Sequence, residues 1–390
     1  MDFNISEEQQ LMLRTASQIG ERFGLDYWRE KDRTNAYPQE IWQAICDAGI
    51  AGIMVPEEYG GLGLGLTDLG LCIEELCKGG AGSTLSQLFM LNPVFGGVAL
   101  RHYGSEAMKR ALLPGLCDGS CTFSMALTEP DAGTNSLAMK TRAEQVQGGW
   151  AISGQKIWIT GVAASRKMLI VARTAQPDTG QKKTHGISLF MVDTDREGIS
   201  HTDIEKLGTN TLPSSVVYLE NVFAGEDEVI GTVDGGWPQL LDILNCERVV
   251  TTAGLLGTGA LALRLAVDYA NERKVFGNRP IGSYQGLQFP LAQRWAELEA
   301  ARLLNLKAAT AYDQGRPFGS DSNAAKLIAS QAASAMAEQA MQVMGGMGYS
   351  KECHVERLWR DARLFRFAPV SEEMILNFIS TANLGLPRSY

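Results

Sequence analysis

The sequence predicts an α+β fold in which two helical regions flank a β-rich middle region. Apolar residues recur at helical spacing near the start, short β-rich runs begin at about Thr122, and the helical pattern returns after Gly235 and Gly236. A chain of 390 residues is also too long for one ordinary hydrophobic core. We therefore expect three domains: an N-terminal helical domain (1–121), a middle antiparallel β-domain (122–234) and a C-terminal helical bundle (235–390).

The first region has clear helix signals. Ser6 and Gln9 form a capping-box pattern at the start of the first predicted helix. Apolar residues then recur three or four positions apart, at Met12, Ala16, Ile19 and Phe23. A second helix is predicted from near Pro38 to Gly49, and further helix should follow the glycine-rich stretch 56–65 up to about residue 119.

The middle region alternates between short β-rich runs and clusters of Gly, Asp, Asn and Thr, which is typical of an antiparallel barrel or sandwich. The predicted strands include WAIS (150–153), KIWIT (156–160), MLIVA (168–172), ISLFMV (187–192) and VVYL (216–219). The last region contains two long Ala- and Leu-rich runs, over 244–277 and 322–344. They carry few charges, so we expect them to be buried on much of their circumference.

Composition and charge exclude several classes of protein. Hydrophobic residues make up 45% of the chain and charged residues 20%, as in a globular domain. A net charge of −9 argues against nucleic acid or an anionic membrane as the main partner. The polar N-terminus is not a secretory signal, and no apolar run is expected to span a membrane. These features predict a cytoplasmic protein.

Metal and Rossmann-type nucleotide sites are not expected. The seven cysteines are scattered, and Cys117 and Cys121 have no second pair of Cys or His at metal-ligand distance, so free thiols are expected. The four histidines show no pairing with Ser or Cys. Neither GGLGLG (60–65) nor GLLGTG (254–259) has the spacing and context of a dinucleotide fingerprint.

Three segments could instead contact a planar or phosphate-bearing ligand. In ALTEPDAGTN (126–135), Thr128 offers a hydroxyl and Gly133 permits close backbone approach, although an ordinary turn explains such a cluster as well. In GQKIWIT (154–160), alternation would put Trp158 and Thr160 on one face and Ile157 and Ile159 on the other, with core packing as the alternative.

The third segment is QVMGGMGYSKE (342–352). Gly345 and Gly346 would end the long helix as a C-cap does, but together with Gly348 they exceed what a cap needs. They would also let a pyrophosphate lie against backbone amides, with Arg273 balancing its charge.

Six segments in this order resemble the acyl-CoA dehydrogenase family over essentially the whole chain. They are PEEYGGLG near residue 56, ALTEPDAGTN, GQKIWIT, ERKVFG (272–277), QVMGGMGY and WRDARL. The resemblance implies an acyl-CoA dehydrogenase-like fold whose C-terminal domain is a four-helix bundle, with FAD bound between the domains. It also implies a homo-oligomer, usually a tetramer.

The resemblance also implies roles for individual residues. One subunit would contact FAD through Leu127 and Thr128 at the pyrimidine edge, Trp158 and Thr160 beside the isoalloxazine, and Gly133 and Ser371. A second copy would hold the FAD pyrophosphate and adenosine through Arg273, Phe276, Gln285, Gln342, Gly345 and Gly346. The acyl-CoA would be contacted by Thr134 (usually Ser in the family), Asn245, Arg248 and Val370. Between Arg273 and Gln285 this chain has one residue more than the family's usual motif, around Asn278-Arg279, so the role of Gln285 is assigned less directly.

Oxidation at Cα and Cβ of a thioester needs a carboxylate to remove the α proton while the β hydride goes to flavin N5. Most of the family places this Glu in a Tyr-Glu-Gly-Thr stretch, which here reads Ala368-Pro369-Val370-Ser371. A minority branch, including isovaleryl- and long-chain acyl-CoA dehydrogenases, carries the base earlier in an L-x-x-E-R segment. This chain has that segment at 244–248, so Glu247 is the candidate base.

Two alternatives for this carboxylate stay open. Glu247 could serve an ordinary helical or capping role, and Glu372 and Glu373 lie near the position that lost its Glu. Pro369 raises a further question, because proline lacks the N–H that the family uses to bind the thioester oxygen. Either the Val370 amide replaces it, or oxyanion binding rests on the flavin ribityl hydroxyl.

These residues predict FAD-dependent dehydrogenation of an acyl-CoA to the trans-2-enoyl-CoA, with electrons passing to an electron-transfer flavoprotein. A branched or cyclic acyl group would suit the altered loop. Two alternatives remain: an enoyl-CoA reductase, oxidase or monooxygenase on the same fold, or a catalytically silent acyl-CoA-binding partner subunit.

Overall fold

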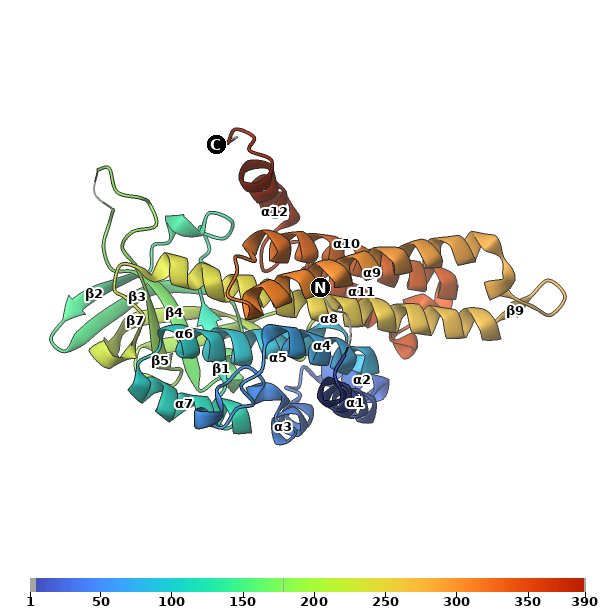
Figure 1. The fold of residues 1–390 in the computed structure, drawn as a ribbon, viewed down its shortest axis with the longest axis horizontal. Helices are drawn as coiled ribbons and strands as arrows, with labels where there is room; N and C mark the ends of the chain where they lie inside the picture. The colour runs from blue at the N-terminus through green and yellow to red at the C-terminus, as the bar shows by residue number, and fades with distance from the viewer. Residues whose placement is uncertain (1–4, 178, 389–390) are drawn as a thin grey trace.

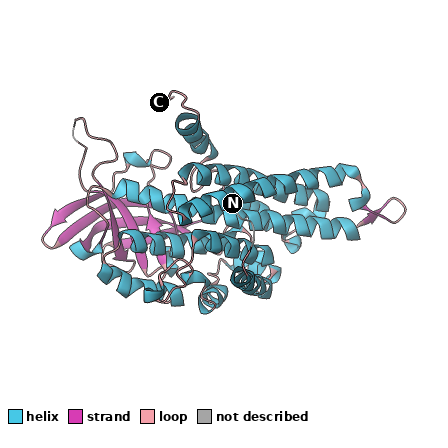
Figure 2. Cartoon of the chain, in the orientation of Figure 1, coloured by secondary structure: helices cyan, strands magenta, loops and turns pink. Residues whose placement is uncertain are grey.

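The structure is a computed structural model that describes residues 5–177 and 179–388. Helices fill most of the first and last regions, and the large sheet of the middle region lies at one end of an elongated molecule (Figures 1 and 2). The helices of the first region are α1 (Glu7–Arg22), α2 (Leu25–Thr34), α3 (Gln39–Asp47), α4 (Leu66–Leu76), α5 (Ser83–Phe89), α6 (Ala99–Tyr103) and α7 (Glu106–Asp118). The domain boundaries given above stay a prediction.

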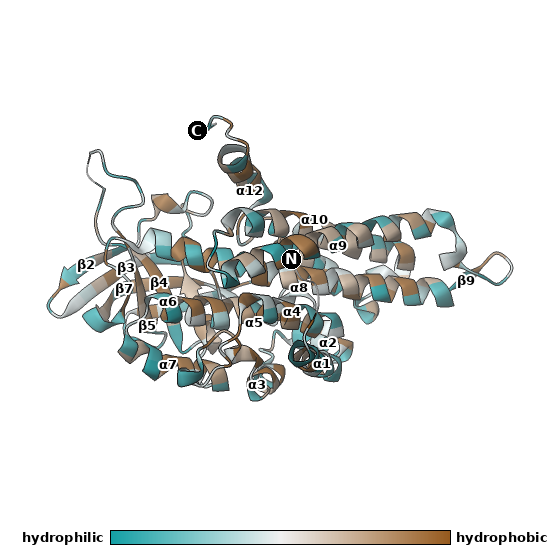
Figure 3. Ribbon diagram, in the orientation of Figure 1, coloured by the Kyte–Doolittle hydropathy of each residue, from teal (hydrophilic) through white to brown (hydrophobic). Residues whose placement is uncertain are grey.

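The N-terminal helices begin and end as their sequence signals indicate. The Ser6 hydroxyl accepts a hydrogen bond from the Gln9 N–H, and the Gln9 side chain accepts one from the Ser6 N–H, which confirms the capping box. Ala16 and Ile19 are buried, whereas the rest of α1 is largely hydrophilic (Figure 3). Helix α3 ends just before Gly49, whose φ of 75° is a left-handed conformation that glycine adopts readily.

The middle region forms one eight-stranded sheet with the order β6-β7-β3-β2-β4-β5-β8, and β1 pairs with β4. Its strands are β1 (Phe123–Ala126), β2 (Arg142–Val146), β3 (Gly149–Thr160), β4 (Lys167–Arg173), β5 (Ile187–Asp193), β6 (Ile199–Ile204), β7 (Ser214–Gly225) and β8 (Val229–Ile230). We expected an antiparallel sheet, but the sheet is mixed, because β1 runs parallel to β4 and β2 also pairs with β4 in parallel. Turn clusters indicate where strands end but not which strands pair, so this detail could not be read from the sequence.

Strands β4 and β5 lie in the centre of the fold and are buried on both faces. Leu169 and Val171 face the core shared with the N-terminal helices, whereas Met168 and Ile170 face the second core on the other side of the sheet. This two-sided burial explains why MLIVA is a continuous apolar run.

The last region contains three long helices that pack on one another and two short ones. They are α8 (Gly236–Glu272), α9 (Gln285–Asp313), α10 (Gly319–Met344), α11 (Val355–Leu364) and α12 (Glu372–Phe378), with the small hairpin β9 (Lys274–Val275) and β10 (Arg279–Pro280) between α8 and α9. Glycines permit close packing on α8: a Cβ at Gly254 would lie 2.2 Å from the Ser86 Oγ, and one at Gly257 would lie 2.4 Å from the Cys77 Cβ.

The apolar character of α8 corrects one expectation. We expected no run of membrane-spanning length, but a window of α8 has a mean hydropathy of 1.5 and is long and apolar enough to cross a membrane. Because 78% of that window is buried within the protein, packing in the core accounts for its composition.

The expected four-helix bundle differs in detail. The short α11 packs against α10 and α8, whereas α12 leaves the body beside α10 (Figure 1). The segment from α12 onward exposes large apolar side chains, with Leu376 at 50% and Leu384 at 65%. A single copy of the chain therefore leaves this part of the bundle uncovered.

A buried polar network in the WRDARL segment joins the three regions. Asp361 on α11 accepts hydrogen bonds from the Thr84 hydroxyl (2.7 Å) and the Thr209 N–H (2.6 Å). Arg357, one turn earlier, donates to the carbonyls of Gly80 and Ala81 and lies 3.5 Å from Asp361. Both charged side chains are almost fully buried, so the motif fixes the bundle to the N-terminal helices and to the β region.

Candidate active site

Glu247 lies on α8 and is only 3% exposed. Its neighbours Cys246, Val249 and Val250 are fully buried and pack in the core, which turns the carboxyl group into the interior. No hydrogen bond or ion pair to this carboxyl occurs among residues 5–177 and 179–388. Burial without a partner is unusual for a carboxylate and makes Glu247 a candidate functional residue.

The charges of two cations act on Glu247, namely Arg248, the next residue on α8, and Lys326 on α10. Burial raises the pKa of Glu247 to about 8, and the charges of Arg248 and Lys326 oppose this rise without overcoming it. Arg248 donates to the Asn245 Oδ1 at 2.5 Å, and its Nε is buried with no acceptor in the described part of the chain. Asn245, Glu247 and Arg248, which were selected from the sequence, thus lie together on α8.

Sequence reasoning missed Lys326. It is fully buried on α10, and its Nζ donates to the Val370 carbonyl oxygen at 2.7 Å. Burial lowers the pKa of Lys326 to about 8, although Glu372, Glu247 and Glu373 favour its charged form. A single lysine inside an otherwise Ala-rich run that is expected to be buried was the signal that could have identified it.

The loop 365–371 connects α11 to α12, and its residue Val370 bonds this cation. Ser371 caps α12, because its hydroxyl accepts a hydrogen bond from the Met374 N–H. The Ala368-Pro369 peptide bond is cis. The Val370 N–H makes no hydrogen bond to any described residue, so this donor is available for a ligand.

The two second-choice carboxylates have different surroundings. Glu372 accepts hydrogen bonds from Arg366 at 2.5 and 2.8 Å and from Gln331 at 3.2 Å. Burial would raise the pKa of Glu372, but these hydrogen bonds outweigh it and lower the pKa. Glu373 is exposed. Glu372 is therefore a structural ion-pair partner, and neither resembles a buried base.

A buried ion pair shapes the loop after β1. The Nζ of Lys156, which is fully buried, donates to the Leu127 carbonyl and to Glu129, both at 2.9 Å. Glu129 also accepts from two backbone N–H groups of the following turn. The Thr128 carbonyl accepts from the Ile157 N–H at 2.9 Å. These contacts fix Leu127 and Thr128 against strand β3.

Strand β3 presents Trp158 outward, at a point where its pairing is irregular. The pairing with β7 shifts register between Lys156 and Ile159, and Trp158 has a φ of 62°. Trp158 is 55% exposed and Ile159 is buried, as the predicted alternation requires, although this bulge interrupts the regular strand geometry at that point. Thr160 bonds the Ser214 hydroxyl at 3.0 Å, near the end of the strand. Gly133 and Thr134 lie in the exposed loop between β1 and β2.

The remaining predicted residues lie at the other end of the molecule. The hairpin that carries Phe276 is at the far tip of the bundle, opposite the sheet (Figure 1). The residues of this group are all exposed: Arg273, Phe276, Gln285, Gln342, Gly345 and Gly346. Asn278 occupies the turn of the hairpin, and Gln285 follows as the first residue of α9. One chain therefore does not bring the two predicted groups together.

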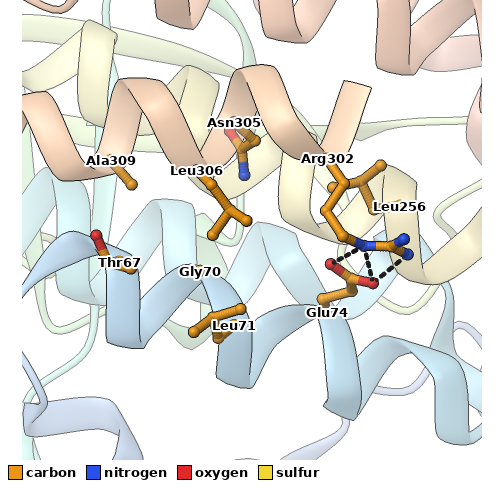
Figure 4. A pocket seen from close by; sticks show the side chains of 9 residues that line it. All are labelled: Thr67, Gly70, Leu71, Glu74, Leu256, Arg302, Asn305, Leu306 and Ala309. Atoms are coloured by element: carbon orange, nitrogen blue, oxygen red, sulfur yellow. Dashed lines mark hydrogen bonds and ion pairs between the residues drawn. The ribbon is translucent and has the colours of Figure 1, made fainter. Parts of the chain in front are cut away.

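Two hollows in the protein lie away from these residues. One, of about 10 Å³, lies between α4 and α9 beside the ion pair of Glu74 and Arg302 (Figure 4). The other, of about 680 Å³, includes Arg101, Asp242 and Arg316 in its lining. Neither hollow is lined by a residue that was predicted to bind the cofactor or substrate or to act in catalysis. No group of three or more His, Cys, Asp or Glu that could hold a metal ion occurs in the described ranges.

The chain belongs to the acyl-CoA dehydrogenase family. Residues 6–120, 124–222 and 234–384 match the N-terminal, middle and C-terminal domains of acyl-CoA dehydrogenases, respectively. The acyl-CoA dehydrogenase fadE12 of Mycobacterium tuberculosis is 40% identical over 99% of this chain and 98% of its own length. A glutaryl-CoA dehydrogenase of Desulfococcus multivorans is 32% identical over the full length of both chains.

Solved structures show the same fold. A glutaryl-coenzyme A dehydrogenase in complex with glutaryl-CoA matches with a TM-score of 0.94, 32% identity and coverage of 100% of this chain and 98% of that chain. A structure named as an electron transferring flavoprotein of Acidaminococcus fermentans matches with a TM-score of 0.93 and 29% identity over 98% and 100%. The FAD complex of PigA matches with a TM-score of 0.92 and 27% identity over 99% and 100%.

Proposed function

We propose that this protein catalyses the FAD-dependent α,β-dehydrogenation of an acyl-CoA to the trans-2-enoyl-CoA, with Glu247 as the base. The observation that carries the proposal is the Glu247 carboxyl group, which is buried on α8 without a hydrogen-bond or ion-pair partner among the described residues. Membership of the acyl-CoA dehydrogenase family supports the reaction class, and the base assignment rests on the residue itself.

The residues present fit an FAD. Trp158 offers an indole that is 55% exposed next to the buried Ile159, as a wall for a planar ring requires. At the other end, a Cβ at Gly345 or Gly346 would meet no atom within 4 Å, so backbone could lie close to a phosphate there. When bound, FAD would supply the acceptor for the hydride that leaves Cβ.

The chain's own residues would handle the proton and the thioester. Glu247 would take the proton from Cα, where the developing negative charge spreads onto the thioester oxygen. The N–H of Val370, which is free in the described structure, would donate to that oxygen in place of the N–H that Pro369 lacks. Arg248 and Asn245 would contact the CoA arm, since the Arg248 Nε still lacks an acceptor.

The proposed enzyme is a homo-oligomer, and a tetramer is the state we propose. The two groups of FAD residues lie at opposite ends of one chain, so a second copy would have to complete each site. Large apolar side chains are exposed at the bundle tip, including Phe276 at 91% and Tyr349 at 85%. Their burial against another copy would remove an unfavourable exposure.

We also propose an electron-transfer flavoprotein as the electron acceptor. The fold match to the structure named as an electron transferring flavoprotein of Acidaminococcus fermentans supports a connection to such electron transfer. For the acyl group of the substrate, we propose a branched or cyclic chain. A cytoplasmic location stays a prediction from the sequence.

Anaerobic mixing with acyl-CoA esters tests the proposed function. We expect the purified protein to be yellow and its flavin absorbance to bleach with at least one ester from a panel of straight, branched and dicarboxylic acyl-CoAs. Bleaching should be faster than with the matching enoyl-CoA, which serves as the control. A protein that binds FAD but is bleached by no member of the panel would contradict a dehydrogenase.

The pH dependence of the reaction should reveal the raised pKa of Glu247. Below that pKa the carboxyl group holds its proton and cannot accept another, so kcat/KM should fall about tenfold for each unit of decreasing pH. Because the pKa is about 8, kcat/KM should rise with pH up to that value and then level off. A profile that is already flat between about pH 5 and 8 would show that the essential base has an ordinary carboxylate pKa.

A further inference from the structure

We propose that Lys326 is a positioning residue of this site. Its ammonium group fixes the loop that carries Val370 to helix α10 and supplies a positive charge that acts on the Glu247 carboxyl group from a neighbouring helix. The catalytic part of this inference rests on the proposed function of Glu247, whereas its electrostatic part can be tested without turnover.

The contact of Lys326 is unusual for a buried cation. Its side chain is fully buried, and its hydrogen bond among the described residues goes to a neutral carbonyl, that of Val370, at 2.7 Å. Burying an ammonium group is costly unless a counter-charge lies near it. No carboxylate of the described chain lies within ion-pair distance of its Nζ, so the nearest negative groups act on it over a longer range.

The charged groups that face Lys326 come from two other elements. Glu372 and Glu373 lie on α12, and Glu247 and Arg248 lie on α8. The charge of Glu372 is already balanced by Arg366 at 2.5 and 2.8 Å, and Glu373 is exposed to solvent. Arg248 repels the Lys326 cation. Glu247 is thus the buried acid without a hydrogen-bond or ion-pair partner among the described residues, and the charge of Lys326 adds to the larger effect of Arg248 in favouring its carboxylate form.

The bond to Val370 adds a geometric role. Glu372 holds the α12 side of this loop through Arg366, both by the side-chain pair and by its N–H to the Arg366 carbonyl at 3.2 Å. Val370 lies between Arg366 and Glu372 without a bond to either, and Lys326 anchors it from α10 through its carbonyl oxygen. Because the Val370 N–H is the proposed donor to the thioester, the same lysine would orient that donor and favour the charged form of the base.

Three substitutions separate the two roles. Lys326→Arg keeps the charge, Lys326→Gln keeps a donor for the Val370 carbonyl, and Lys326→Met keeps neither. Lys167→Met is the matched control, because Lys167 is also a largely buried lysine (13% exposed) and its partner is Asp193 on the sheet. The Gln and Arg variants keep the inference testable if the Met variant does not fold.

The first readout is the titration of Glu247 in the FAD-loaded protein without acyl-CoA. Difference infrared spectroscopy follows the protonated carboxyl band that is absent from Glu247→Gln. We expect the midpoint to rise in both Lys326→Met and Lys326→Gln, since a cation that favours the carboxylate is lost. Lys326→Arg should move it less, and Lys167→Met should leave it unchanged.

The second readout is the pH profile of kcat/KM with the acyl-CoA that bleaches the native flavin fastest. Its rising limb should move by the same amount in Lys326→Met and Lys326→Gln, so that kcat/KM at pH 7 falls about tenfold for every pH unit by which the limb moves. Lys326→Met should also raise KM for acyl-CoA above that of Lys326→Gln, because only the Gln variant still anchors Val370.

The outcomes distinguish this inference from the proposed function. An unchanged infrared midpoint in both uncharged variants would overturn the electrostatic role of Lys326, and equal KM values in Met and Gln would overturn the anchoring role. A shifted midpoint together with a fully active Glu247→Gln enzyme would support the electrostatic role and contradict only the assignment of Glu247 as the base.

Discussion

Replacing Glu247 by Gln should lower the rate of flavin reduction by acyl-CoA about 10²- to 10⁴-fold, which is the range expected when a general base is removed. Glutamine has nearly the same shape but cannot accept the α proton. The Glu247 carboxyl group makes no hydrogen bond in the described structure, so the substitution breaks no polar contact that holds the fold. Stopped-flow absorbance under anaerobic conditions measures the rate directly.

Glu373→Gln is the matched control for this prediction. Glu373 lies four positions after Pro369, where most of the family carries its base, but it is exposed on the first turn of α12. Its substitution should leave the rate of flavin reduction within about twofold of native, because exposed substitutions away from a site have little effect. A large loss in Glu373→Gln with a mild one in Glu247→Gln would reverse the assignment.

Replacing Arg357 by Met should destabilise the protein by about 3–5 kcal/mol, because one partner of a buried charge pair is left uncompensated. Arg357 bonds the carbonyls of Gly80 and Ala81, and Asp361 beside it holds Thr84 and Thr209. The substitution leaves two carbonyls and a buried carboxyl group without their cation. Denaturant unfolding, followed by circular dichroism, measures the change.

Arg363→Met is the comparison for the buried arginine. Arg363 lies on the same helix but is exposed, where it stacks over the Phe367 ring at 5.3 Å. Its loss should change the free energy of unfolding by no more than about 1 kcal/mol. If both variants unfold at the same denaturant concentration, the network at Arg357 does not hold the three regions together.

Much of the fold could be predicted because its signals are local. The capping box at Ser6, the C-cap at Gly345 and the apolar run MLIVA each reflect a short-range rule that the structure confirms. The pairing of β1 with β4 in parallel and the position of α12 depend on contacts between distant segments. Such contacts leave no periodic trace in the sequence.

In the candidate site, too, residues close together in the sequence could be predicted, whereas contacts between distant segments could not. Glu247, Arg248 and Asn245 lie within four positions of one helix, so a motif found them together. Lys326 and Val370 are 44 positions apart, and nothing in either segment indicates that α10 meets the loop before α12. The bulge at Trp158 is a third case, because a register shift with β7 depends on the pairing of distant segments.

Exchange of the Cα hydrogen of acyl-CoA in ²H₂O tests most directly whether Glu247 is the proton acceptor. The FAD-loaded protein is incubated anaerobically with the most reactive ester, and mass spectrometry of the recovered thioester measures deuterium at Cα. We predict exchange in the native protein and in Glu373→Gln, and none above background in Glu247→Gln. Native-like exchange in Glu247→Gln would contradict the role assigned to this carboxylate.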